Sequence, residues 1–299
     1  MSVFDRREAL LVFGGTGQVG RALIRADASV VAPARGVADL TEASSVSAVV
    51  ERLRPRAIIN AAAWTAVDAA EDEEDAAFAV NALGAGHIAK AAAAHGVPLV
   101  LISTDYVFDG QGMAPWRPED TVSPLGAYGR TKCAAEERVR DAGGAHAILR
   151  TSWVFSPDGV NFVKSMLRLS ETRESLTIVS DQVGGPTAAA DIAGACLAIA
   201  DQLAADPGKT GTYHYSGAPD VSWADFARVI FAMAGRSTEV TDIPSTDYPT
   251  PAERPKNSRL DCSTTEDVFG LARPDWRGAL GSVLEELGIE RQDREEAGT

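Results

Sequence analysis

Tyr128 and Lys132 are the residues whose types and spacing most directly suggest chemistry. They are four positions apart, so on a helix their side chains share one face. A nearby ammonium stabilises a phenolate and lowers the pKa of the tyrosine. Such a tyrosine can donate a proton to a carbonyl oxygen as hydride reaches the carbon, or act in reverse. An isolated pair of this kind also fits an inert helix surface, so its meaning depends on its surroundings.

Polar residues follow the apolar run that ends at Ser103, and Thr104 and Asp105 are the first of them. In an open α/β sheet, ligands bind outside the carboxyl ends of the strands. A Thr104 hydroxyl at such a place can hydrogen-bond both a substrate carbonyl and the tyrosine. The alternative is a turn in which these side chains bond only the local backbone.

A glycine-rich loop follows the first apolar run, and its glycines are Gly14, Gly17 and Gly20. In dinucleotide sites, glycines at such spacing allow a tight turn, close approach of the pyrophosphate, and packing of helix on strand. The helix that begins there offers free N–H groups and a partial positive charge to phosphates. The loop therefore predicts a dinucleotide-binding site.

The choice between the two nicotinamide cofactors depends on the residues after the second apolar run. An acid about 20 residues beyond the loop would bind the ribose 2′-hydroxyl. Here the run ends at Arg35 without an acid, and Asp39 lies further on, where it can serve the adenosine. A guanidinium suits a 2′-phosphate, so we expect NADPH, with NADH possible. The alternative for Arg35 is a solvated surface arginine.

A third group of interest is basic and lies in a proline-rich stretch. Arg254, Lys256 and Arg259 are close together in a chain whose net charge is −14. A local basic cluster of this kind is what a bound pyrophosphate requires. A solvated loop is the alternative interpretation.

The elements that must position these residues alternate through the first half of the chain. Short apolar runs predict strands at 9–13, 29–32, 57–60, 97–103 and 147–151. Helical patterns lie between them at 19–25, 44–53, 74–95 and 127–140. Buried strands that alternate with helices predict an α/β fold with a doubly wound, parallel Rossmann-type sheet.

The second half of the chain predicts a smaller α/β substrate-binding lobe. Helices are expected at 161–170, 188–203 and 222–234, the last with Ser222 as its cap, and a strand at 176–179. The dinucleotide-binding domain is expected over 9–155, with about 188–206 returning to it. The substrate-binding lobe is expected over 156–187 and 207–289, followed by a frayed tail at 290–299.

Composition excludes several classes of protein. The 299 residues are 45% hydrophobic and strongly acidic, which argues against a non-specific partner of nucleic acid or anionic membrane. No apolar run is long enough for a transmembrane helix. A charged first segment without an apolar core favours a cytoplasmic protein. The three cysteines and four histidines show no metal-ligand spacing, so we expect free thiols and no metal site.

Several segments together resemble the extended short-chain dehydrogenase/reductase superfamily, and they are Gly14–Gly20, Asn60–Asp68, Ser103–Phe108 and Tyr128–Lys132. Further segments resemble, more narrowly, the dTDP-4-dehydrorhamnose reductase family, and they are Arg150–Phe155, Asp181–Thr187 and Tyr248–Leu260. The resemblance extends over nearly the whole chain, from about Leu10 to Leu287.

This resemblance implies reduction of dTDP-4-dehydro-6-deoxy-L-mannose to dTDP-L-rhamnose with NADPH. It implies that Tyr128 is the proton donor, that Lys132 binds the nicotinamide ribose and that Thr104 assists Tyr128. The implied cofactor contacts are Gly17, Gln18 and Val19 at the pyrophosphate, Asp39 and Leu40 beside adenine, and Ala63, Trp64 and Thr65 along the channel. The implied contacts with the dTDP-sugar are Thr104, Asp105, Trp153, Arg254 and Asn257.

Two departures from the family pattern affect these expectations. Many members carry histidine where Trp64 stands, which bears on cofactor preference. Some members dimerise through a magnesium ion held by glutamates after the glycine loop and after the Pro-Thr motif. The corresponding segments here, Gly20–Ala22 and Thr187–Ala190, have no carboxylate. We therefore expect a monomer or a dimer formed without a metal.

Two other functions are compatible with the same motifs. One is a 4-ketoreductase of another nucleotide deoxysugar pathway, because the motifs do not fix the stereochemistry of the ring. The other is a non-catalytic NADP-binding regulatory subunit. The joint presence of Thr104, Tyr128 and Lys132 favours an enzyme, because a regulatory subunit does not need all three.

Overall fold

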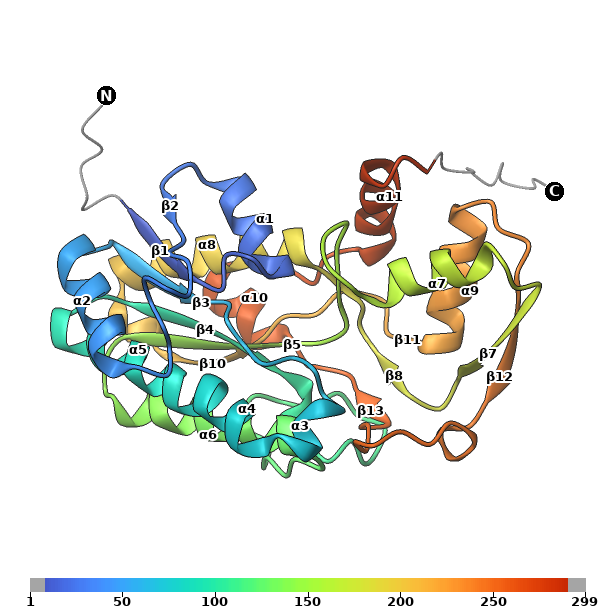
Figure 1. The fold of residues 1–299 in the computed structure, drawn as a ribbon, viewed down its shortest axis with the longest axis horizontal. Coiled ribbons are helices and arrows are strands. Elements are labelled where there is room, and N and C mark those ends of the chain that lie inside the picture. The colour runs from blue at the N-terminus through green and yellow to red at the C-terminus, as the bar shows by residue number, and fades with distance from the viewer. Residues whose placement is uncertain (1–8, 290–299) are drawn as a thin grey trace.

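A parallel sheet forms the centre of the first lobe. In the computed structural model, which describes residues 9–289, six strands pair in the order β10-β5-β4-β3-β1-β2 (Figure 1). In that order they span Gly211–His214, His146–Thr151, Leu99–Thr104, Ala57–Asn60, Leu10–Phe13 and Val30–Val31. The strand order changes direction between β1 and β3, so the expected doubly wound Rossmann-type sheet is confirmed.

Helices cover both faces of this sheet because its strands are apolar on both faces. In β1, Leu10 and Val12 pack toward one face, and Leu11 and Phe13 toward the other. The first face is covered by α1, α8 and α10, which span Gln18–Ala26, Ala189–Ala205 and Ser263–Phe269. The second face is covered by α2, α5 and α6, which span Ala43–Leu53, Gly84–His95 and Ala127–Asp141.

The prediction of a single helix over 74–95 is wrong in detail. The structure has α3 at Ala69–Asp72, then α4 at Glu74–Phe78, a π-helical turn at Ala79–Leu83, and α5. Such a turn inserts one extra residue and is frequent at functional sites. Here it contains Asn81, which is buried among residues of the site described below.

Strand β10 was not anticipated from the sequence. It lies within the 207–289 range that was assigned to the second lobe, but it pairs in parallel with β5 in the central sheet. Its four residues, Gly-Thr-Tyr-His, form no apolar run, so the pattern gave no strand there. Helix α10 packs against β10 and α8, which places this segment in the first lobe as well (Figure 1).

The second lobe has an aromatic core and short strand pairs. Its helices α7, α9 and α11 span Phe162–Ser170, Trp223–Met233 and Trp276–Glu286. Its paired strands are β7 at Ser175–Val179 with β12 at Glu239–Ile243, and β6 at Val154–Phe155 with β9 at Thr187–Ala188. A further small sheet has the order β11-β8-β13 and spans Val221–Ser222, Val183–Gly184 and Asn257–Ser258. The expected cap of α9 is present, because Ser222 Oγ accepts from Asp225 N at 3.0 Å.

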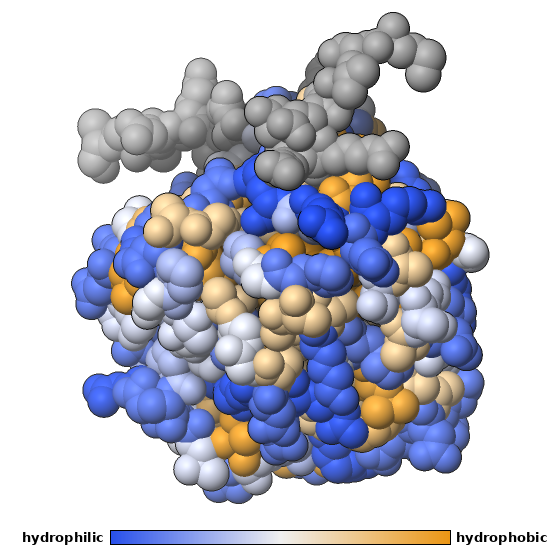
Figure 2. Space-filling view, turned by 90° about the vertical axis from the view of Figure 1, so that its left-hand side faces the viewer, coloured by the Kyte–Doolittle hydropathy of each residue, from blue (hydrophilic) through white to orange (hydrophobic). Residues whose placement is uncertain are grey.

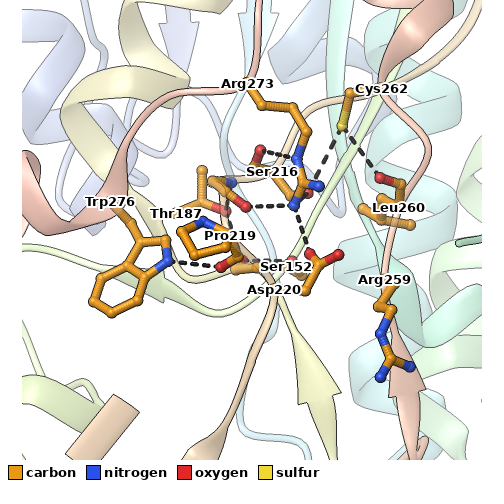
Figure 3. A network of polar contacts seen from close by, with 12 residues as sticks. Ser152, Thr187, Ser216, Pro219, Asp220, Arg259, Leu260, Cys262, Arg273 and Trp276 are labelled. Carbon is orange, nitrogen blue, oxygen red and sulfur yellow. Dashed lines mark hydrogen bonds and ion pairs between the residues drawn. The ribbon is translucent and has the colours of Figure 1, made fainter. Parts of the chain in front are cut away.

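A polar network links the end of β10 to the segment before α11 (Figure 3). Arg273 donates to the backbone oxygen of Ser216 at 3.1 Å and to Asp220 Oδ1 at 2.5 Å. Trp276 Nε1 donates to Pro219 O at 2.8 Å. These contacts connect the central sheet to the core of the second lobe.

The outer surface carries both hydrophobic and hydrophilic residues. On the face shown in Figure 2, hydrophobic residues occur in small groups among hydrophilic ones. Within residues 9–289 there is no helix that is both long and apolar enough to cross a bilayer. The tail expected to be frayed, 290–299, lies outside the described residues.

Candidate active site

The glycine loop forms one wall of a cavity of about 540 Å³. Gly14 has φ +88°, a conformation that favours glycine, and it directly follows β1. A Cβ on Gly20 would lie only 2.1 Å from Gly14 O, so a side chain there would break the turn. The predicted cofactor residues that line the cavity are Gly14, Gly17, Arg35, Asp39, Leu40 and Ala63. A backbone cradle of this shape at a helix N-terminus fits the pyrophosphate and adenosine of a dinucleotide.

Gln18 and Val19, the other residues predicted at the pyrophosphate, begin α1. Val19 is buried in the core. The side chain of Gln18 faces the second lobe, where its Oε1 accepts from Ser156 Oγ at 2.8 Å and Asn161 Nδ2 at 3.0 Å. The start of α1 is therefore a point of contact between the lobes.

Arg35 and Asp39 lie together at the adenosine end of the cavity. Arg35 Nε is 3.5 Å from Asp39 Oδ2, and the Arg35 side chain is 79% exposed. Asp39 Oδ1 accepts from the Thr41 backbone N–H at 3.0 Å and from its hydroxyl at 2.8 Å, and these bonds lower the pKa of Asp39. Arg35 therefore has most of its guanidinium available at the rim.

Asn81 connects the predicted cofactor channel to the helix of the tyrosine. Its Oδ1 accepts from Trp64 N at 2.7 Å, and its Nδ2 donates to Trp64 O at 3.1 Å and to Thr131 Oγ1 at 2.9 Å. Trp64 and Tyr128 pack against the same small cluster of buried alanines, whereas Thr65 is exposed. Sequence reasoning missed Asn81, although a lone amide in an alanine-rich helix was a usable signal.

Tyr128, Thr104 and Asp105 meet where β4 ends and α6 begins. Thr104 Oγ1 donates to Asp105 Oδ1 at 3.0 Å and accepts from Tyr106 N at 3.2 Å. Thr104 also hydrogen-bonds Tyr128, which opposes the rise in the pKa of Tyr128 caused by burial and by the charge of Asp105. The phenol therefore holds its proton at neutral pH.

Asp105 is almost completely buried, and its Oδ2 has no hydrogen-bond partner among residues 9–289. Burial raises the pKa of Asp105 to about 6, against hydrogen bonding from Ser258 and Thr104. Ser258 comes from β13 of the second lobe. The carboxylate therefore lies where the two lobes meet.

Lys132 lies one turn after Tyr128 on α6 and is also buried. Its Nζ donates to Ile102 O at 2.7 Å. Burial lowers the pKa of Lys132 to about 8, and the carboxylate of Glu136 opposes this. Glu136 lies one turn further on, where it accepts from Ser103 Oγ at 2.7 Å and from Arg150 Nη2 at 2.7 Å. Glu136 and Arg150 are further residues of the site that sequence reasoning did not identify.

Two members of the predicted basic cluster are paired with acids, and the third, Arg259, donates to Asn257 Oδ1 at 3.0 Å. Arg254 forms a two-pronged ion pair with Asp68 of the first lobe, with distances of 2.5 and 2.7 Å. Lys256 Nζ is 3.0 Å from Asp181 Oδ2. Asn257 is buried, and its Nδ2 donates to Ala114 O at 2.8 Å. The charge of Arg254 opposes the rise in the pKa of Tyr106 that burial causes.

Trp153 follows β5 and is stacked on Trp223, with ring centroids 3.6 Å apart. Its φ is +49°, which is unusual for a residue with a side chain. Trp153 thus lies in the second lobe, beside the small sheet that carries Ser258.

The doubly wound sheet, the glycine cradle and Tyr128 beside Thr104, with Lys132 one turn further along α6, together define a class of protein. This arrangement is that of the extended short-chain dehydrogenases/reductases. The comparisons narrow the class: the family model described as RmlD substrate binding domain matches residues 8–289. The chain belongs to the dTDP-4-dehydrorhamnose reductase family.

Named relatives agree with this assignment over nearly the full length. The chain is 42% identical to a dTDP-4-dehydrorhamnose reductase of Sinorhizobium fredii, over 95% of this chain and 99% of the relative. The solved structure of such a reductase from Clostridium acetobutylicum is 35% identical, with TM-score 0.89, and covers 94% of this chain and 100% of its own. The solved structure of a dTDP-4-dehydrorhamnose reductase from Bacillus anthracis, in complex with NADP, is 34% identical, with TM-score 0.87. The match covers 94% of this chain and 99% of that structure's chain.

Proposed function

We propose that this protein reduces the C4 ketone of dTDP-4-dehydro-6-deoxy-L-mannose with NADPH to give dTDP-L-rhamnose. The observation that carries the proposal is that Tyr128 lies beside Thr104 at the carboxyl end of β4, in the same lobe as the glycine cradle, while Lys132 bonds the backbone oxygen of Ile102 on the same strand. Membership of the reductase family, with a relative solved in complex with NADP, supports the same reaction.

Tyr128 acts as the proton donor in this proposal. Burial and the charge of Asp105 raise the pKa of Tyr128, so the phenol stays protonated until a more basic alkoxide forms beside it. The bound nicotinamide supplies the hydride. The ammonium of Lys132, on the same face of α6, stabilises the phenolate that remains after proton transfer. Thr104 orients the tyrosine hydroxyl, and Asp105 fixes the direction in which Thr104 donates.

Arg35 supports NADPH as the preferred cofactor. Its exposed guanidinium lies at the rim of the cavity, where it can reach a 2′-phosphate, and Asp39 engages it at only one long contact. A guanidinium on a phosphate forms charge-assisted hydrogen bonds that a 2′-hydroxyl cannot provide.

The experiment that tests the proposal is a product analysis. Purified protein is incubated with the keto-sugar, made in situ, and with NADPH carrying deuterium at C4 of the nicotinamide. We expect loss of NADPH absorbance and dTDP-L-rhamnose with deuterium at C4 of the sugar, seen by NMR. Formation of only the C4 epimer of dTDP-L-rhamnose, or reduction of a different keto-sugar only, would favour a different deoxysugar pathway. Cofactor binding without any turnover would favour the regulatory-subunit alternative.

A further inference from the structure

The backbone of Trp153 is held in its unusual conformation from both sides. Ser152 Oγ donates to Gly185 O at 2.8 Å, and Thr187 N donates to Trp153 O at 3.2 Å. Ser152 and Thr187 lie in the network that joins the lobes (Figure 3). Hydrogen bonds on both sides of Trp153 thus hold its backbone in a strained conformation. Such strain is typical of functional sites, and here it indicates that the direction of the indole matters for function.

The indole of Trp153 is positioned by the small sheet of the second lobe. Its ring is nearly parallel to that of Trp223, at 10°, and Trp223 is the first residue of α9, directly after β11. Gly184 of β8 pairs with Val221 of β11. A Cβ on Gly184 would lie 3.0 Å from Trp153 Cε2, so glycine at this position leaves room for the indole.

The other edge of the same sheet reaches the predicted catalytic residues. Ser258 of β13 pairs with Gly184, and its side chain lies close enough to Asp105 to oppose the rise in the pKa of Asp105. Asp105 in turn accepts from Thr104. Ser258 therefore lies between the indole of Trp153 and the pair Asp105 and Thr104 beside Tyr128. The indole remains partly exposed, although Trp223 covers one of its faces.

We propose that Trp223 is a positioning residue that holds the indole of Trp153 as a flat wall against the apolar face of the bound sugar. This inference rests on the proposed function. An aromatic ring packs well against the C–H groups on one face of a pyranose. A 6-deoxy sugar has no hydroxyl at C6, so this packing removes no polar group at C6 from water. Phe162 packs against Trp223, with centroids 4.5 Å apart, and anchors the stack in the lobe core.

The first test is equilibrium binding, which does not need turnover. Isothermal calorimetry compares dTDP-L-rhamnose with dTDP on the wild type and on Trp223→Leu. We expect the variant to bind dTDP-L-rhamnose about 3- to 10-fold more weakly, because one aromatic stack is lost, and to bind dTDP unchanged. Trp223→Phe retains a ring and should keep most of the affinity.

Trp276→Phe is the matched control. Trp276 is fully buried in the core of the same lobe and does not stack on Trp153, so its substitution loosens the lobe without removing the stack. We expect it to leave the ratio of the two affinities unchanged. A purely structural role of Trp223 predicts instead that Trp223→Leu and Trp276→Phe behave alike.

A spectroscopic readout tests the stack itself. Two stacked indoles give coupled far-ultraviolet circular dichroism bands, and we expect these bands to disappear in Trp223→Phe and in Trp153→Phe. The proposal is overturned if the bands persist, or if Trp223→Leu binds dTDP-L-rhamnose like the wild type or weakens dTDP equally. A wild type that gains no affinity from the sugar also overturns it. A wild type that binds dTDP-L-rhamnose but never oxidises NADPH contradicts the proposed function and leaves this inference standing.

Discussion

Asp105 is a buried carboxylate whose Oδ2 has no partner among the described residues. Removing a carboxylate from water costs free energy, and here that cost raises the pKa of Asp105 from 3.8 to about 6. The unfolded chain has no such burial, so ionised Asp105 destabilises the fold. A group of this kind at a candidate site is expected where function, not stability, sets the residue type.

We predict that Asp105→Asn stabilises the protein in a pH-dependent way. Because the folded pKa is raised, the destabilisation is complete above about pH 6 and absent below the unfolded value of 3.8. The free energy of unfolding at pH 8 should rise by up to about 3 kcal/mol, and by far less at pH 4. Urea unfolding at both pH values measures this. Equal effects at the two pH values would show that burial of charge is not the cause.

Arg35 sets the cofactor preference in this account. Arg35→Gln should lower the ratio of kcat/KM for NADPH to that for NADH about tenfold, because a charge-assisted contact with the 2′-phosphate is lost. Initial rates with each cofactor measure the ratio. Arg52→Gln, on the exposed side of α2, removes the same charge away from the cavity and should have no effect. An unchanged ratio in Arg35→Gln would place the determinant elsewhere.

At the scale of elements, α6 carries two of the three residues that we propose for catalysis. Tyr128, Lys132 and Glu136 follow one another at one-turn spacing on this helix. Glu71 Oε1 accepts from Ala127 N at 2.8 Å and so caps the first turn. The carboxylate of Glu136 lies between Lys132, Ser103 and Arg150, and thereby couples α6 to β4 and β5.

We predict that Glu136→Gln moves the alkaline limb of activity. Burial lowers the pKa of Lys132 to about 8 and Glu136 raises it, so without that carboxylate the ammonium is lost at lower pH. The pH profile of kcat/KM for NADPH should shift down by about one pH unit. Glu137→Gln is the control, since Glu137 is exposed on the same helix. Circular dichroism confirms folding, and an unshifted limb in folded Glu136→Gln would contradict the coupling.

The elements also show how far the sequence could be read. The strands expected at 57–60 and 147–151 are β3 and β5, because buried parallel strands are continuous apolar runs. Strand β10 was missed because its four residues carry no such run. The π-helical turn was missed because helical periodicity continues through one extra residue. Thr104, Tyr128 and Lys132 could be singled out from the sequence because each belongs to a local motif, and their roles at the site stay a prediction.

At the scale of the whole molecule, contacts between segments that are distant in the chain could not be predicted from the sequence. Asp68 and Arg254 are far apart in the chain, and no local sequence pattern predicts the ion pair between them. The motif residues of both segments were noticed, and Arg254 with its neighbours was expected to face the nucleotide, but the carboxylate partner of Arg254 was not foreseen. In the structure, this pair and the contacts of Gln18 with Ser156 and Asn161 link the two lobes at different places.

We predict that Asp68→Asn strengthens binding of dTDP. The carboxylate competes with a diphosphate for Arg254, and a partly exposed pair of this kind is weak. The affinity should rise about 2- to 5-fold, as measured by calorimetry at fixed ionic strength. Asp72→Asn, an exposed residue of α3, controls for the change in net charge. Weaker binding in Asp68→Asn would show that the ion pair holds Arg254 in its working position.

Tyr128→Phe removes the phenol hydroxyl that we propose to protonate the reduced sugar. The measurement is the rate of NADPH oxidation with the keto-sugar, alongside NADPH binding by fluorescence. Tyr213→Phe removes a hydroxyl that donates to Lys209 O, and it serves as the matched control. We expect Tyr128→Phe to lose about 100- to 10,000-fold in kcat with NADPH still bound, and the control to keep its rate. A Tyr128→Phe protein that turns over like the wild type would contradict the account.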